Sequence, residues 1–230
     1  MGCSSCETKV VGSMIKMIEF DKEESLIECI YEIKDYNEIQ IINNRDGEDV
    51  NGEIESKIKI WNNKQKEKLI YNKKFSQLGI NTINFKIEEK ITNLSYIFKD
   101  CSSLKKIKFI GGIIENIVNM KLMFSGCINL ESIDLSNINT SNVNSMLGIF
   151  NQCYKLNEII GLDKLDTSKV INMRGMFREC NMIEYLVLSN FDTSNVTDMA
   201  FMFDHCYKLK EIIGLDKFNT SRITDMKFII

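Results

Sequence analysis

The stretch Ser189–Leu209, SNFDTSNVTDMAFMFDHCYKL, decides the fold because its pattern recurs along the chain. It contains one Phe-x-x-Cys pair, and such pairs begin at Phe98, Phe124, Phe150, Phe177 and Phe203. Their cysteines are Cys101, Cys127, Cys153, Cys180 and Cys206, so successive steps are 26, 26, 27 and 26 residues. Apolar residues three and six positions after each cysteine keep the same interval. A shared period of this length indicates repeat units that stack on one another.

Each unit is predicted to contain a short strand, a turn and a short helix. In the unit that starts at Cys127, apolar and polar residues alternate up to Leu135, which predicts a strand with one buried face. The Asn- and Ser-rich segment 137–142 predicts a turn. Val143, Met146 and Phe150 then recur at helical spacing and predict a short helix. Neither element can bury its apolar side alone, so neighbouring units must complete the core.

Two of these blocks, FDTSNVTDMAFMFDHC and INTSNVNSMLGIFNQC, resemble the 26-residue leucine-rich repeats of BspA-like, DUF285-type surface proteins. The resemblance covers residues 91–230 and implies an α/β solenoid, with a parallel strand ladder on a concave face and short helices on the convex face. It also implies a binding or structural role without catalysis. We therefore expect about five units, each of strand, turn and short helix, over residues 91–230. Two units that read IIGLDK contain Gly161 and Gly214, which could absorb a bulge.

The flanks of the repeats carry separate expectations. Residues 25–90 do not follow the period, and their alternating segments predict a small antiparallel β-domain that caps the first unit. In it, Leu26–Ile33 and Glu38–Ile42 are predicted to form a hairpin. At the other end the last unit is incomplete, since the chain stops at Ile230 where the next Phe is expected. Truncation is the favoured hypothesis, and a partner that covers this end is the alternative.

Composition argues against several classes of protein. The 230 residues carry a net charge of -3 with both signs intermixed, so no nucleic-acid footprint is visible. Five of the eight cysteines occupy one slot of successive units, which predicts buried structural thiols rather than disulfides or metal ligands. The single histidine, His205, leaves no convergent metal set, and no phosphate, dinucleotide or hydrolase motif is present. We expect no metal, no cofactor and no catalysis.

The N-terminal segment 1–24 begins MGCSSC, which predicts lipidation. Gly2 is placed for N-myristoylation, although Cys6 stands where the usual pattern has Ser or Thr. The segment resembles the N-termini of some Src-family kinases, which implies palmitoylation of Cys3 and Cys6. A second acyl chain is needed because one myristoyl chain binds membranes only marginally. The expected location is the cytoplasmic face of a membrane, with the cytosol or cell surface as alternatives. A metal or redox Cys-x-x-Cys pair, or an accident of a disordered tail, are the competing interpretations.

The predicted function is protein–protein interaction through the concave face, with an unknown protein as ligand. The outward strand positions mix charge with one aromatic residue, a composition that suits protein contact. These candidate binding residues are Lys106, Lys108, Ser132, Asp134, Glu158, Tyr185, Val187 and Glu211. Two alternatives remain open. One is an extracellular, adhesin-like protein, and the other is a scaffold whose repeats assemble end to end.

Overall fold

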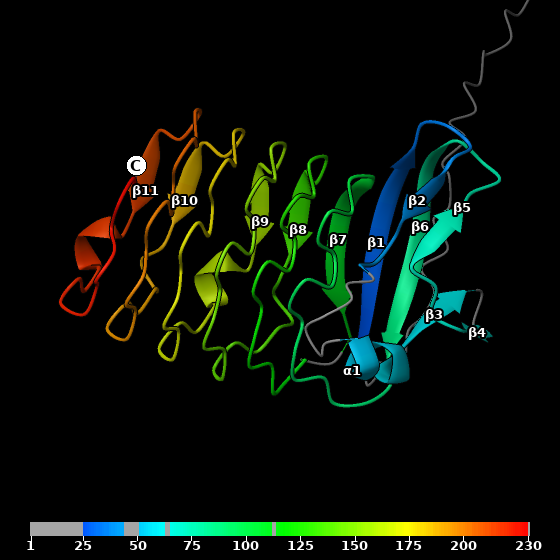
Figure 1. Ribbon diagram of the computed structural model, residues 1–230, viewed down its shortest axis with the longest axis horizontal. Helices are drawn as coiled ribbons and strands as arrows, with labels where there is room; N and C mark the ends of the chain where they lie inside the picture. Colours follow the sequence, from blue (N-terminus) through cyan, green and yellow to red (C-terminus); the bar gives the residue numbers. More distant parts are fainter. Residues whose placement is uncertain (1–24, 44–50, 63–64, 112–113, 230) are drawn as a thin grey trace, which may run out of the picture.

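The computed structural model describes residues 25–43, 51–62, 65–111 and 114–229, and it consists mainly of short strands and turns (Figure 1). The larger sheet has seven strands in the order β4-β3-β6-β1-β7-β8-β9. Two further pairs, β2-β5 and β10-β11, complete the described strands. Their bounds are β1 (Ser25–Ile33), β2 (Glu38–Gln40), β3 (Ile58–Asn62), β4 (Gln65–Glu67), β5 (Asn72–Lys74), β6 (Gly79–Ile87), β7 (Leu104–Ile110), β8 (Ser132–Asp134), β9 (Glu158–Ile160), β10 (Tyr185–Val187) and β11 (Glu211–Ile213).

The seven-stranded sheet changes from antiparallel to parallel at β7. Strand β1 pairs antiparallel with β6 on one side and with β7 on the other, whereas β7, β8 and β9 run parallel. The predicted hairpin of Leu26–Ile33 with Glu38–Ile42 is wrong, because β2 pairs with β5 instead. A three-residue β2 could not cover the nine residues of β1, whereas the nine-residue β6 does. Sheet and core therefore continue across residue 90, where the sequence predicts a domain boundary.

Successive repeats are joined by backbone hydrogen bonds at several points of each unit. Besides the strands, a row of parallel bridges links neighbouring units through Asn93, Asn119, Ser145, Asn172, Asp198 and Asp225. The amides of the repeated phenylalanines also bond to the following unit. For example, the Phe124 N–H donates to the Ile149 carbonyl at 2.9 Å, and the Phe150 N–H donates to the Met176 carbonyl at 3.0 Å. The result is the row of stacked units seen from green to red in Figure 1. We call it the repeat stack.

The prediction of an α/β solenoid with a short helix in every unit is wrong. In the described part of the chain the only α-helix is α1 (Asn51–Lys57), which lies before the repeats. Short 3-10 helices, η1 (Leu162–Lys164) and η2 (Leu215–Lys217), follow Gly161 and Gly214. The structure is instead a mostly-sheet domain built on a mixed sheet, and the apolar residues that recur at helical spacing lie in turns or close to isolated bridges.

Backbone geometry explains why no helix forms there. Each unit holds two residues with positive φ in the segment around its phenylalanine, such as Gly148 (φ 55°) and Gln152 (φ 61°). An α-helix needs φ near −63° at every position, so such a pair interrupts it within one turn. Alternate amides of the segment bond to the neighbouring unit, and those between them bond to the carbonyl three residues back rather than four. Equivalent pairs are Tyr96 with Asp100, Leu122 with Gly126, Gly175 with Glu179, and Phe201 with His205.

A ladder of buried phenylalanines runs through the repeat stack. Consecutive rings from Phe98 to Phe203 are stacked with centroids 5.8, 6.0, 5.6 and 5.9 Å apart. Three of these pairs are nearly parallel, at 3–6°, whereas Phe150 and Phe177 meet at 22°. The cysteines lie beside this ladder, and four of the five are fully buried, with Cys206 partly so. The same core cluster continues into Phe85 and Tyr31 of the antiparallel strands.

Recurrent Asn, Asp and Thr residues hold the turns of the units. The Asp166 carboxylate accepts the N–H of Ser168 at 3.0 Å, and Asn139, Asp192 and Asn219 do the same in their own units. Thr167 Oγ1 donates to the Asp192 carbonyl at 3.0 Å, which links one unit to the next. The Asn and Asp side chains thus form Asx-turns, and their oxygens bond to backbone N–H groups.

Candidate protein-interaction face

All eight sequence-predicted binding residues lie on one side of strands β7 to β11. Buried positions alternate with them, since Ile107, Ile133 and Leu186 point into the core. We call the outer side the strand face. Lys106, Lys108, Glu158, Tyr185, Val187 and Glu211 are exposed there, and Ser132 and Asp134 are half-buried. The structure divides them between two sheets, because β9 ends the seven-stranded sheet and β10 belongs to the pair with β11.

Charge changes along the strand face. At its β7 end, Lys106 stands opposite Ser132, and Lys108 stands opposite Asp134 on β8 and Glu28 on β1. Lys108 Nζ is 3.6 Å from the Asp134 carboxylate. Burial acts to raise the pKa of Asp134, but hydrogen bonds from Ser136 and the charge of Lys108 outweigh it and hold the pKa below its ordinary value. This end is a polar surface on which Lys108 and Asp134 form an ion pair.

The other end of the strand face is apolar. Ile160, Tyr185, Val187 and Ile213 expose 45%, 59%, 46% and 46% of their surface. Val187 and Ile213 face each other directly in the β10–β11 register, and Ile160 occupies the equivalent position on β9. Single exposed apolar residues are ordinary on protein surfaces, but several on neighbouring strands mark an interaction site.

Sequence reasoning missed Ile160 and Ile213. It counted only Glu158 and Glu211 as outward positions in the two IIGLDK units. A strand alternates with period two, so the residue two positions after each glutamate points to the same side. The observed register places Ile160 beside Asp134, a residue that the sequence analysis did select. Applying the alternation to all five strands would have revealed the apolar row.

A cleft separates β9 from β10. Among the described residues, no backbone hydrogen bond joins segment 157–163 to segment 183–188, although β8–β9 and β10–β11 are both paired. At one end the two units are still linked, because the Asn190 side-chain amide donates to the Asp163 carbonyl at 2.6 Å. The Phe150–Phe177 ring pair, with its tilt of 22°, lies at the same junction.

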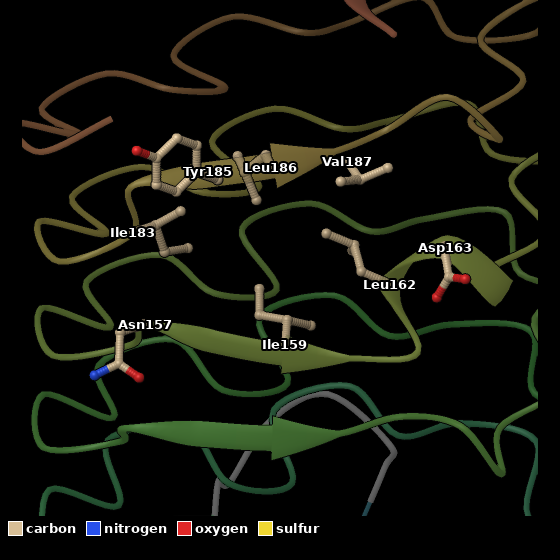
Figure 2. Close-up of a pocket in the computed structure, with 8 residues that line it drawn as sticks. All are labelled: Asn157, Ile159, Leu162, Asp163, Ile183, Tyr185, Leu186 and Val187. Carbon is tan, nitrogen blue, oxygen red and sulfur yellow. The ribbon is translucent and has the colours of Figure 1, made fainter. Parts of the chain in front are cut away.

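The cleft has a volume of about 310 Å³ and a mostly apolar lining. Figure 2 shows Ile159, Leu162 and Ile183 in the space between the two strands, with Tyr185 and Val187 along β10. Leu162, Ile183 and Leu186 are buried and form its floor. The polar members of the lining are Asn157 and Asp163. An apolar floor with few polar groups is typical of a binding site.

Asp163 belongs to the lining of this cleft, and Glu158 lies between the lining residues Asn157 and Ile159. Glu158 on β9 and Asp163 on η1 form no ion pair within the described part of the chain. The nearest paired group is Glu184, whose carboxylate is 2.6 Å from Lys210 Nζ. That hydrogen bond, together with the charge of Lys210, holds the pKa of Glu184 below its ordinary value. Lys210 Nζ also lies 5.6 Å from the centre of the Tyr185 ring. Charged groups of both signs therefore lie near the cleft, and Glu158 and Asp163 are the carboxylates among them without an ion pair in the described chain.

The structure does not describe the predicted lipidation residues. Gly2, Cys3 and Cys6 lie outside the described residues. Within the ranges that the structure describes, no group of His, Cys, Asp and Glu is placed to hold a metal ion. Over those same ranges, no helix has the length and apolar character that crossing a membrane requires.

One protein-family model matches the chain. It is described as "Mycoplasma protein of unknown function, DUF285", and it matches residues 65–162, 92–184 and 158–230. The three overlapping matches together span residues 65–230, well over half of the chain. They include every strand of the strand face. No curated protein and no solved structure matches the chain.

Proposed function

Because the chain belongs to the DUF285 family, a family described as being of unknown function, we propose that this repeat protein is a non-catalytic protein-binding module that uses its strand face. The observation that carries the proposal is the exposed apolar row of Ile160, Tyr185, Val187 and Ile213 on neighbouring strands. Aromatic and aliphatic side chains ringed by polar groups are typical of interface centres.

The rest of the strand face supports the same proposal. The repeat stack fixes the backbone by hydrogen bonds from unit to unit, so surface positions can vary without loss of the core. A binding surface on such a frame loses little conformational entropy when a partner docks. The carboxylates that recur in the turns, such as Asp166 and Asp192, accept backbone N–H groups, which favours a structural role for them over catalysis.

Site-specific photo-crosslinking tests the proposal. p-Benzoylphenylalanine replaces Tyr185 in one variant and Ile171 in the other, and both variants are irradiated in the cells that make the protein. Ile171 is a matched control because it is 50% exposed but lies next to the Asn172 bridge rather than on a strand of the strand face. We expect a distinct protein adduct from position 185 alone. No adduct there, or the same adducts from both positions, contradicts the proposal.

The identity of the adduct also separates the alternatives. A second copy of this chain at position 185 would favour end-to-end or face-to-face assembly, and an extracellular protein would favour the adhesin-like role. We further propose that the module is held at a membrane by acyl chains on Gly2, Cys3 and Cys6. This part rests on the MGCSSC sequence, and its test is described in the Discussion.

A further inference from the structure

We infer that the cleft between β9 and β10 is a docking site for an extended peptide segment of a partner protein, with apolar side chains entering the cleft and Lys or Arg beside them. The inference rests on the proposed function and goes further, because it names the site on the strand face and the chemistry of the occupant. Three independent features of the cleft lead to it: its backbone edges, its floor and its charge.

The backbone edges of the cleft lack strand partners. In a parallel ladder each residue directs its N–H and C=O to one side, and successive residues alternate. The Leu135 N–H donates to the Ile160 carbonyl at 2.9 Å, so the backbone N–H and C=O of Ile160 point toward β8. The backbone N–H and C=O of Ile159 therefore point toward β10. The Leu188 N–H donates to the Ile213 carbonyl at 2.8 Å, so the backbone groups of Leu188 point toward β11. By the same alternation, the backbone N–H and C=O groups of Tyr185 and Val187 point toward β9.

These edges specify what kind of ligand fits. Ile159, Tyr185 and Val187 present both donors and acceptors at the spacing of a strand, and none of these groups bonds to another described residue. A second extended backbone supplies acceptors and donors with the same repeat, as in other cases where a peptide adds to an exposed strand edge. A small apolar molecule would leave these backbone groups without partners, at a cost in free energy.

The floor and rim define the side chains of the occupant. Leu162, Ile183 and Leu186 make an apolar floor, so residues that point inward should be aliphatic or aromatic. Successive residues of an extended peptide point to opposite sides, so the inward residues alternate with outward ones. Outward residues pass Asp163 in the lining and lie near Glu158 on β9, and neither carboxylate forms an ion pair in the described chain. Charge complementarity therefore favours Lys or Arg at those positions.

Peptide selection on the full chain tests the inference. A phage-displayed library of random dodecapeptides is selected on the immobilised protein, and enriched sequences are synthesised with a fluorescent label. Anisotropy then gives their dissociation constants. We expect enriched sequences with alternating apolar residues and a net positive charge. Val187→Lys should weaken binding by about tenfold or more, because it places a cation against the rim of the cleft. N-methylation of the peptide backbone at alternate residues should weaken binding similarly.

Ile171→Lys is the matched control variant. Ile171 is 50% exposed and lies next to the Asn172 bridge rather than on a strand of the strand face. We expect Ile171→Lys to change the dissociation constant by less than about threefold. Circular dichroism and thermal unfolding establish that each variant is folded.

The outcomes of these experiments separate the cleft inference from the proposed function. Equal loss in Val187→Lys and Ile171→Lys would overturn the cleft inference. Insensitivity to backbone N-methylation would overturn strand-like docking. Selection of no peptide would overturn the inference too, and the crosslink at position 185 would then decide the proposed function by itself.

Discussion

The thiol of Cys153 donates a hydrogen bond to the carbonyl oxygen of Phe124 in the preceding unit, with an S···O distance of 3.1 Å. The same bond joins Cys127 to Phe98, Cys180 to Phe150 and Cys206 to Phe177, at 2.9, 3.2 and 3.0 Å. A cysteine in this slot is small enough for the core and still satisfies a buried carbonyl. The repeated Phe-x-x-Cys pair is therefore an inter-unit contact, which explains why it recurs.

Protonated thiols at these positions should make stability depend on alkaline pH. Burial raises the pKa of Cys101 from 9.0 to about 12. Above pH 9 the unfolded thiol ionises and the folded one does not, so the contribution is complete below pH 9 and is lost as pH rises toward 12. The loss approaches about 1.4 kcal/mol per pH unit. Urea unfolding of wild type and Cys101→Ala between pH 8 and about 11 measures it.

The comparison with Cys101→Ala isolates this thiol from lysines and tyrosines that titrate in the same range. We expect the free energy of unfolding of the wild type to fall relative to that of Cys101→Ala as pH rises above 9. A difference that stays constant over the range would show that Cys101 keeps the same pKa in the folded and unfolded chains.

The phenylalanine ladder should dominate the stability of the repeat stack. Phe150 is fully buried between Phe124 and Phe177. Phe150→Ala should lower the free energy of unfolding by about 3–5 kcal/mol through lost contacts and a cavity. Tyr36, which is 57% exposed, is the control, and Tyr36→Ala should change it by less than about 0.5 kcal/mol. Similar losses of stability in both variants would contradict the claim that the phenylalanine ladder dominates the stability of the repeat stack.

Gly161 should be required for close contact between units. It has φ 81°, and a Cβ there would lie 2.8 Å from the Ser136 nitrogen. Gly79 has a similar φ of 90° but open space around that position. Gly79→Ala should lower the free energy of unfolding by about 1–2 kcal/mol through backbone strain. Gly161→Ala should lower it by about 1–3 kcal/mol more, because the added Cβ overpacks the contact with Ser136. Thermal unfolding of both variants measures the difference, and equal costs would refute the contact.

Acylation of the N-terminus is tested in cells fed an alkyne analogue of myristate. We expect label on the wild-type protein and none on Gly2→Ala, because the glycine amine is the acceptor. Cys3→Ser/Cys6→Ser should keep the myristate label but lose most membrane association, since one chain binds marginally. Fractionation after ultracentrifugation measures the distribution. Membrane association of unlabelled Gly2→Ala would rule out this anchor.

The repeat period and the buried faces could be predicted from the sequence because they depend on local alternation. Phe150, Cys153 and Met146 are buried as their spacing predicts. The helix could not be excluded, since apolar residues at helical spacing also arise when a coil turns through two positive-φ residues. Gly148 is an obvious site for such a turn, but Gln152 is not. Positive φ at Gln152 depends on its bond to the next unit, where its N–H donates to the Arg178 carbonyl.

The remaining differences between the predicted and the observed fold arise from pairing of strands that are distant in sequence. Strand β1 lies between β6 and β7, which are distant in sequence, so a local pattern favoured the nearer but shorter β2. The cleft at β9–β10 also escaped prediction. The 27-residue step from Cys153 to Cys180 marks the unit where it opens, but only the structure shows that the strand ladder breaks there. Of the outward apolar residues that the sequence reasoning missed, Ile160 lies on β9, which borders that break.

Amide hydrogen exchange with and without a selected peptide tests the central claim most directly. The claim is that a partner's extended segment docks along the open edges of β9 and β10. Saturating peptide should slow exchange at the amides of Ile159, Tyr185 and Val187, while amides of the phenylalanine ladder keep their rates. Unchanged exchange at these three amides, with protection elsewhere on the strand face or none at all, would contradict it.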